Sequence, residues 1–295
     1  MKILTLASFC VDVFPQSGKI LPGGESLNLG VNCKQAGAEV FVMGNIGKDK
    51  YGQAIKDAID KYALNRERIY ELDGETANHI IHIDETGDRY FKEGAWTGGV
   101  LEKFKISTSD KDFLNTMDAV ATTFTAPDFE NIVKRQSEKW NVESGINDKS
   151  NSSGLPRGFA ARNDGQKRPI MAVDFNDFEL KPEYEKYFPY IDLFFVSAKS
   201  QNSAQVRKTL KEWSEKYNTV FTVTLAEHGS VAYKKGKEFV CQAEKVKEVV
   251  DTTGCGDSYQ AGFIMEYFKS KDIEKSMQNG SKFAAKTLSF VGGFK

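Results

Sequence analysis

Short apolar runs rich in β-branched residues alternate with amphipathic segments along most of the chain. The runs that are typical of buried strands are residues 39–43, 170–174, 192–196 and 219–224. The segments with the apolar spacing of helices are residues 27–36, 51–62, 128–138 and 204–217. This alternation predicts an α/β fold, in which a central, mostly parallel sheet is flanked by helices.

Two segments depart from this rhythm. Residues 11–21 and 78–92 alternate polar and apolar positions without a helical period. Within the second, a turn at residues 85–88 predicts a β-hairpin. Together they predict a small β-sheet over about residues 11–24 and 78–100, and this sheet is a candidate lid over a binding site. An edge hairpin without a function is the alternative.

One stretch is unlike the rest of the chain. Residues 141–167 are rich in Asn, Ser, Gly and Asp and have few apolar anchors, which predicts a flexible surface insertion. An oligomer contact or a specificity loop is the alternative. The remaining pattern is continuous, so we expect a single domain over residues 1–295.

Composition narrows the class of protein. The 295 residues carry 40 Lys and Arg against 41 Asp and Glu, a net charge of -1, which argues against nucleic acid or an anionic membrane as the partner. No apolar run reaches the length of about 18 residues that a membrane span needs, and no signal peptide is evident. The four cysteines are scattered, which favours a reducing, cytoplasmic location.

The strongest chemical signal lies near residue 254. A short apolar strand expected at residues 249–250 leads into Gly254 and Gly256, and a helix should begin there. Free N–H groups at a helix start form an anion site suited to a phosphate. Asp257 at its mouth could accept the proton of an attacking hydroxyl group. The alternative is that Asp257 or Ser258 only caps the helix.

Two other nucleotide-binding motifs are missing. The chain contains no GxxxxGK[ST] segment, which argues against a Walker-type phosphate loop. Residues 7–12 follow the first strand without a glycine triplet, which argues against a nicotinamide dehydrogenase.

These motifs together resemble a known family. Residues 251–257, Asp-Thr-Thr-Gly-Cys-Gly-Asp, resemble the DTxGAGD signature of the PfkB (ribokinase-like) family of carbohydrate kinases. Residues 23–28 resemble its GGxxxN element, and residues 44–52 resemble its GxxGxDxxG element. Within the family the chain is most similar to fructoselysine 6-kinases, through residues 10–16, 172–175 and 290–294.

The resemblance implies a ribokinase-like fold and a set of site residues. The residues implied to bind the sugar are Asp12, Gly23, Gly24, Asn28, Phe91 and Trp96. Those implied to carry the phosphoryl transfer are Gly254, Cys255, Gly256 and Asp257, with Asp257 as the base. Phe91 and Trp96 would shield the sugar from the lid, with ordinary packing as the alternative. For Asn28 the alternative is an amide satisfied within its own helix.

The resemblance also extends to the nucleotide. Residues 222–230 resemble the TLGxxGS turn near ATP, and the implied ATP-binding residues are Thr224, Ala226, Gly229 and Thr252. Ala226 replaces a glycine, and we expect it to keep a negative φ. Residues 196–200 lack the NxxE motif linked to Mg²⁺, so no Mg²⁺ ligand is assigned and the ion is expected on water and phosphates.

Three further expectations concern ions, reactivity and the sugar. Asp251 and Thr253 are candidate ligands of a monovalent cation such as K⁺, whereas Asp251 as an anchor of the turn is the alternative. Cys255, at a helix start, is expected to have a lowered thiol pKa and to react with alkylating agents. For a charged substrate tail the candidates are Glu25, Arg89 and Glu93.

The sequence thus predicts a kinase that uses ATP and Mg²⁺ to phosphorylate a hydroxymethyl group of a small-molecule sugar. The first expected substrate is a fructosamine such as fructoselysine, phosphorylated at its 6-position. The alternatives are a ribokinase, a fructokinase or a nucleoside kinase of the same family, and a non-catalytic sensor of sugar or nucleotide. The family resemblance also implies a homodimer formed through the lid.

Overall fold

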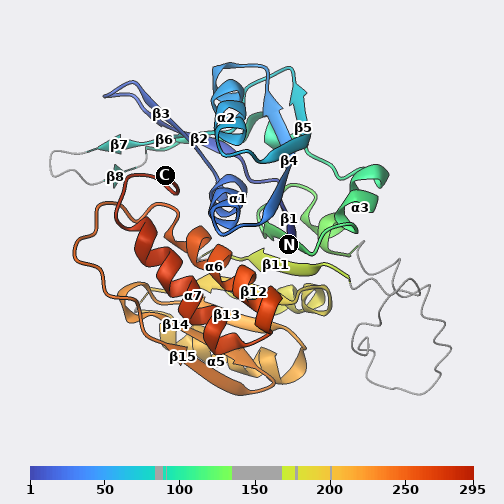
Figure 1. Cartoon of the computed structure of the whole chain (residues 1–295), viewed down its shortest axis with the longest axis vertical. Coiled ribbons are helices and arrows are strands. Elements are labelled where there is room, and N and C mark those ends of the chain that lie inside the picture. Colours follow the sequence, from blue (N-terminus) through green and yellow to red (C-terminus); the bar gives the residue numbers. More distant parts are fainter. Residues whose placement is uncertain (84–88, 91, 135–167, 177–178, 200) are drawn as a thin grey trace.

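A large twisted sheet runs through the middle of the molecule (Figure 1). The computed structural model describes residues 1–83, 89–90, 92–134, 168–176, 179–199 and 201–295. In spatial order, the strands of the sheet are β15 (Lys237–Cys241), β14 (Ser230–Lys234), β13 (Val220–Thr224), β12 (Leu193–Ser197), β11 (Ile170–Asp174), β10 (Ala119–Thr123), β1 (Lys2–Leu6), β4 (Glu39–Gly47) and β5 (Asn65–Leu72).

The sheet is mostly parallel, as the sequence predicts. Antiparallel pairing occurs only where β13 meets β14 and where β14 meets β15. The four predicted strands are present as β4, β11, β12 and β13. The sheet also includes β1, which the apolar N-terminal residues form, and β5 and β10, which the period of the sequence did not single out.

Helices cover both faces of this sheet. On one face lie α1 (Glu25–Gln35), α2 (Lys50–Lys61), α6 (Cys255–Ser270) and α7 (Ile273–Thr287). On the other lie α3 (Thr108–Leu114), α5 (Ser203–Lys216) and the 3₁₀ helix η2 (Pro182–Tyr190). Two shorter 3₁₀ helices are η1 (Gly99–Lys103) and η3 (Ala226–His228). Three of the four predicted helices are confirmed as α1, α2 and α5. Of the fourth, residues 129–134 are helical and the remainder lies outside the described residues.

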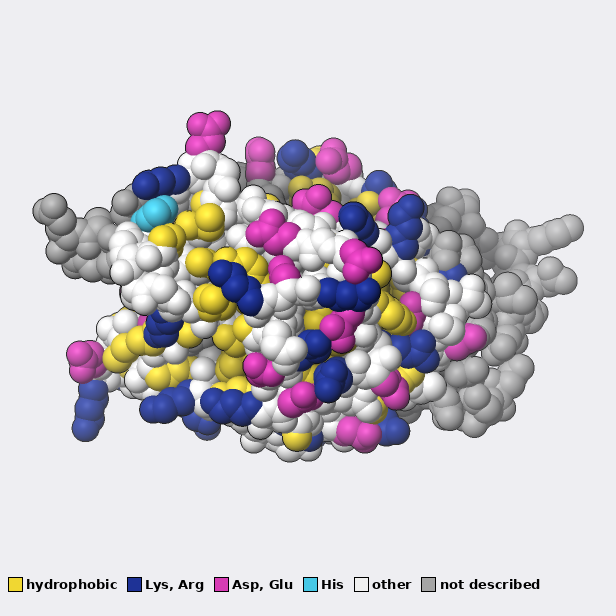
Figure 2. Space-filling view, turned by 90° about the horizontal axis from the view of Figure 1, so that it is seen from above, with side chains coloured by type: hydrophobic (Ala, Val, Ile, Leu, Met, Phe, Trp, Pro, Cys, Tyr) yellow, Lys and Arg dark blue, Asp and Glu magenta, His cyan; other side chains and the backbone are white. Residues whose placement is uncertain are grey.

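Alternating side chains of the central strands supply two cores. In β12, Leu193 and Phe195 join the core under α1 and α6, whereas Phe194 and Val196 join the core under α5. Strands buried on both faces are typical of parallel sheets, which explains why these runs are apolar without alternation. The outer face in Figure 2 shows acidic and basic side chains interspersed, in keeping with the near-zero net charge.

A separate small sheet lies beside the large one, near the C-terminus in Figure 1. Its strands, in order, are β3 (Lys19–Gly23), β2 (Cys10–Phe14), β6 (Asn78–Ile80) and β9 (Trp96–Thr97). A second pair, β7 (His82–Ile83) with β8 (Arg89–Tyr90), is antiparallel, which confirms the predicted hairpin. The two segments predicted to form a small sheet therefore pair with each other.

One strand prediction is wrong. Residues 242–254, which connect β15 to α6, contain no strand. Val249 and Val250 are 54% and 50% exposed, so these apolar residues do not mark a buried element. The predicted insertion at residues 141–167 lies outside the described residues. Among the described helices, none combines the length and apolar character that crossing a bilayer requires.

Candidate active site

The order of the strands identifies one edge of the sheet as a binding crevice. From β1 the chain proceeds to β4 and β5 on one side, and from β10 to β13 on the other. In open parallel sheets such a reversal creates a crevice at the carboxyl ends of the strands, where ligands bind. The amino-terminal ends of α1 and α6 meet at this edge, as the contacts below show.

Two of the predicted site residues are in direct contact. The Asn28 side-chain amide on α1 donates a hydrogen bond of 2.8 Å to Oδ2 of Asp257 on α6, although 229 positions separate them in the chain. Both side chains are buried. The Asn28 amide is therefore satisfied by Asp257 rather than within its own helix, and it retains a second N–H and its oxygen for another partner.

The pKa of Asp257 is raised well above its ordinary value. Burial is the largest cause, and the negative charges of Glu25 and Asp174 add to it, while the hydrogen bond from Asn28 acts in the opposite direction. A carboxylate with a raised proton affinity is a better general base than an exposed one at neutral pH. This environment fits the role of base better than that of a helix cap.

A second set of polar contacts lies beside Asp257. Asn176 donates a side-chain hydrogen bond to Oε1 of Glu25, and Gln260 donates one to Oδ2 of Asp174. The Thr123 hydroxyl group donates to Oδ1 of Asn176 at 3.1 Å. Sequence patterns did not indicate Thr123, Asn176 or Gln260. The only signal was a polar residue at or just after the end of a buried strand for Thr123 and Asn176, and Gln260 lies inside α6.

The start of α1 is fixed by close backbone packing. Gly24 has a φ of 89°, and a Cβ atom there would lie 2.5 Å from the carbonyl oxygen of Ser8. Ser26 and Ser8 exchange two hydrogen bonds, of 3.0 and 3.1 Å. Gly23, at the end of β3, shows only ordinary contacts for such a Cβ atom. Only Gly24 is thus required by the observed packing.

Asp12 lies on β2 of the small sheet, opposite Leu21 on β3 and His79 on β6. Its charge, with those of Glu25 and Asp257, adds to the effect of burial in raising the pKa of the Cys10 thiol. The charge of Asp12 therefore acts in the same region as the charges of Glu25 and Asp257. Among the described residues no group of three or more side chains could hold a metal ion, His79 and His82 included.

At the start of α6, Gly254 is closely packed, whereas Gly256 lies beside open space. Gly254 caps the helix with a φ of 72°, and a Cβ atom there would lie 2.4 Å from Cα of Gly293. Around Gly256 such an atom would meet nothing within 4 Å. The N–H groups of the first helical turn have no acceptor within the helix, so they are available to an anion.

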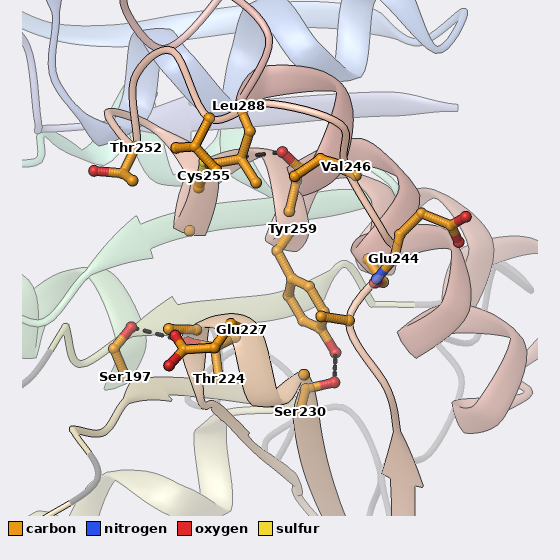
Figure 3. Close-up of a pocket in the computed structure, with 18 of the residues that line it drawn as sticks. Ser197, Thr224, Glu227, Ser230, Glu244, Val246, Thr252, Cys255, Tyr259 and Leu288 are labelled. Atoms are coloured by element: carbon orange, nitrogen blue, oxygen red, sulfur yellow. Dashed lines mark hydrogen bonds between the residues drawn. The ribbon is translucent and has the colours of Figure 1, made fainter.

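A pocket of about 630 Å³ opens on the other side of this helix start (Figure 3). Thr224, Ala226, Gly229 and Thr252, the residues predicted to bind ATP, all line it together with Cys255 and Gly256. Figure 3 shows Tyr259 extending from α6 toward Ser230, to which its hydroxyl group donates a hydrogen bond of 2.8 Å. Gly256 therefore faces the pocket, whereas Asp257 faces Asn28.

Two expectations about this pocket are wrong. Ala226 has a φ of 49° rather than a negative value, so it adopts the left-handed conformation that its glycine counterpart would favour. Burial, with the charges of Asp251 and Asp257, raises the pKa of Cys255 to about 12. At neutral pH this thiol is therefore protonated, which contradicts the expected reactivity.

The contacts of Asp251 are those of a turn anchor. Its Oδ1 accepts hydrogen bonds from the backbone and hydroxyl groups of Thr253, at 2.9 and 2.8 Å. Its Oδ2 accepts one from the backbone N–H of Gly292, at 2.8 Å. These bonds join the turn before α6 to the C-terminal loop, which agrees with the alternative to a cation ligand.

The remaining predicted residues have other positions. Trp96 on β9 is 49% exposed and packs edge-on against His79. Phe91 and the side chain of Arg89 lie outside the described residues. Residues 44–52 link α2 to the segment that contains Thr76. Asp49 caps α2 by accepting a hydrogen bond from Gly52, and it also accepts two hydrogen bonds from Thr76.

Comparison with known sequences gives consistent matches. The sequence pattern described as pfkB family carbohydrate kinase matches residues 11–293. A fructoselysine 6-kinase of Escherichia coli (strain K12) is 28% identical over 295 residues, which cover 100% of both chains. A fructosamine kinase of Bacillus subtilis (strain 168) is 24% identical over 100% of this chain and 93% of its own.

Solved structures show the same fold. The structure of Arabidopsis thaliana ribokinase complexed with ribose and ATP superposes with a TM-score of 0.77 and 15% identity, over 99% of this chain and 93% of that one. The structure of adenosine kinase from Sinorhizobium meliloti superposes with a TM-score of 0.74 and 16% identity, over 100% and 95%. At these identities the likeness establishes the ribokinase-like fold.

Proposed function

The chain belongs to the pfkB family of carbohydrate kinases, and on that premise we propose that it transfers the γ-phosphate of ATP to the 6-hydroxyl group of a fructosamine such as fructoselysine. The enzyme class, a phosphotransferase acting on a sugar, follows from the family. One observation carries the assignment of the site. The buried Asp257 is held by Asn28 immediately beside the helix start that faces the pocket.

Asp257 is the proposed base. Its Oδ2 is fixed by Asn28 at 2.8 Å, and its raised pKa suits it to take the proton of a hydroxymethyl group as the oxygen attacks phosphorus. The backbone N–H groups at the start of α6 would stabilise the charge on the transferred phosphoryl group. Gly254 and Gly256 would permit this approach, and the Cys255 side chain would take no chemical part.

The pocket of Figure 3 is the proposed ATP site, because it leads to the helix start from the side opposite Asp257. The nucleotide and the sugar would then meet across the first turn of α6, which favours in-line transfer. Mg²⁺ bound to the phosphates would neutralise their charge. The ion would be held mainly by phosphates and water, as is common for Mg²⁺.

The choice of a fructosamine rests on two kinds of support. The first is the name of two relatives, a fructoselysine 6-kinase and a fructosamine kinase, which match over 100% and 93% of their own lengths. The second is the acidic character of the crevice, where Glu25 and Asp174 accompany Asp257. A fructosamine carries a basic nitrogen, whereas ribose, fructose and nucleosides lack an amine of this basicity.

The test is ADP release by the purified protein with Mg-ATP and a panel of fructoselysine, fructose, ribose and adenosine. Asp257→Asn preserves shape and binding but removes the base, so we expect turnover to fall by about 10²- to 10⁴-fold with little change in ligand affinity. Asp60→Asn, at an exposed position of α2, is the matched control and should keep full activity.

Two results would contradict this proposal. Near-normal turnover by Asp257→Asn would remove that residue from the role of base. Binding of sugar and nucleotide without any turnover by the wild type would indicate a sensor rather than an enzyme. Preferred turnover of ribose or adenosine would keep the kinase but change its substrate.

A further inference from the structure

Glu25 is the residue of the crevice that the proposed phosphoryl transfer leaves without a role. It is the first residue of α1 and follows Gly24, whose backbone is packed against residues 8–10. Ser26, the next residue, is held by Ser8 through two hydrogen bonds. The backbone on both sides of Glu25 is thus fixed, so its side chain enters the crevice from a rigid support.

The two oxygens of the Glu25 carboxylate differ. Oε1 accepts a hydrogen bond from the side-chain amide of Asn176. Oε2 is buried and has no hydrogen-bond partner among the residues that the structure describes. A buried carboxylate oxygen without a partner is costly, so it calls for an explanation such as a ligand that is bound during function.

The surroundings indicate the charge of the missing partner. Glu25 and Asp174 both raise the pKa of Asp257 through their charges, so the three carboxylates lie within electrostatic reach of one another. Burial raises the pKa of Glu25 as well, and the nearby side chains of Asn176 and Thr123 act in the opposite direction. A bound cation would relieve this repulsion, whereas a neutral hydroxyl group would supply a hydrogen bond but no charge.

An ammonium group suits this position. Oε2 offers a single carboxylate oxygen, to which an ammonium group donates a directed N–H hydrogen bond.

We propose that Glu25 selects the substrate by binding the protonated amine of an amino-deoxy ketose through Oε2. The proposal rests on the proposed sugar kinase activity and adds the group that the crevice recognises. In the furanose form of such a sugar, the two exocyclic carbons lie on either side of the ring oxygen. The hydroxymethyl carbon can therefore face Asp257 while the carbon that bears the amine faces Glu25.

The sharpest test compares two sugars that differ in one group, 1-amino-1-deoxyfructose and fructose. We expect the wild type to prefer the amine in both binding and kcat/KM by about 10- to 100-fold, the usual range for hydrogen bonds to a charged group. Glu25→Gln keeps the shape but removes the charge. It should abolish that preference, so the ratio of kcat/KM for the two sugars should fall to within about threefold of one, whatever the value for either sugar alone.

Glu39→Gln is the matched control, because Glu39 is exposed at the start of β4 and its substitution should leave both sugars unaffected. An equal loss on both sugars in Glu25→Gln would show a merely structural role and overturn the proposal. Absence of any amine preference in the wild type would overturn it without reference to a variant, so the test does not depend on the folding of Glu25→Gln.

Calorimetric binding separates this proposal from the kinase activity. If neither sugar is phosphorylated but the amine binds more tightly than fructose, and Glu25→Gln removes the difference, the role of Glu25 stands and the proposed enzyme function fails. If fructose is phosphorylated without any preference for the amine, the kinase stands and the role of Glu25 fails.

Discussion

The two sides of the first turn of α6 are built differently. On the proposed sugar side, Asn28 and Asp257 are buried and Glu25 is half-buried, and hydrogen bonds and mutual repulsion set the positions of these side chains. On the proposed nucleotide side, Gly229 and Ala226 shape an open pocket through backbone turns with positive φ. Side-chain chemistry should therefore determine the sugar end, whereas backbone conformation should determine the nucleotide end.

The junction between these two sides should be the most sensitive point. Gly254 has a φ of 72°, and an added Cβ atom would lie 2.4 Å from Cα of Gly293. We expect Gly254→Ala to lower the free energy of unfolding by about 2–4 kcal/mol, from strain and overpacking. Because the anion site would also be displaced, turnover should fall by about 100-fold or more. Denaturant unfolding and steady-state kinetics measure both effects.

The control for this substitution is two positions away. Gly256→Ala adds a Cβ atom into open space, within a helix where alanine is favoured, so it should not reduce the free energy of unfolding. If Gly254→Ala were as stable as Gly256→Ala, the tight approach of the C-terminal loop to α6 would not be a feature of the protein in solution.

The sugar side should also respond to pH. The base must be ionised, and the pKa of Asp257 is raised, so kcat/KM should decrease by about tenfold per pH unit below that raised pKa, which lies above the usual carboxyl range. Removing the neighbouring charge by Glu25→Gln should lower the pKa of Asp257, so the decrease of kcat/KM on the acid side (the acid limb of the profile) should occur at lower pH.

Protein stability should change with pH in the direction opposite to kcat/KM. The folded state binds the Asp257 proton more tightly than the unfolded chain does. Its contribution to stability is therefore full below the ordinary carboxyl pKa and is lost as pH rises through the raised one. Profiles of kcat/KM and of unfolding for the wild type and for Glu25→Gln test both points. An identical acid limb in the two proteins would argue against electrostatic coupling across the crevice.

The smallest effect is expected on the nucleotide side. Ala226 has a φ of 49°, so Ala226→Gly relieves backbone strain but makes the unfolded chain more flexible. We expect a net gain of about 0.5–1 kcal/mol in the free energy of unfolding, measured as a shift in the denaturant midpoint. Gly229→Ala should do the opposite, because its Cβ atom would lie 2.1 Å from the carbonyl oxygen of Cys241. A loss of stability in Ala226→Gly would contradict the strained turn.

Sequence reasoning succeeded where a local pattern has one structural meaning. The apolar runs of β11, β12 and β13 were predicted because strands buried on both faces must be apolar. The four residues predicted to bind ATP lie together in one pocket because their turns carry a motif, while their role stays a prediction. The strand prediction at Val249 and Val250 was wrong because two apolar residues are too few to show a period. Only the fold shows that these side chains are exposed and belong to no strand.

By itself, the sequence determined the α/β class and the glycine-rich helix start, and it indicated Asp257 as the proposed base, because these depend on residues adjacent in the chain. Tertiary structure alone decided that Asn28 holds Asp257, that one buried oxygen of Glu25 lacks a partner among the described residues and that the thiol of Cys255 has a raised pKa. The reason is physical: hydrogen bonding, burial and charge repulsion depend on distances between segments that only folding brings together.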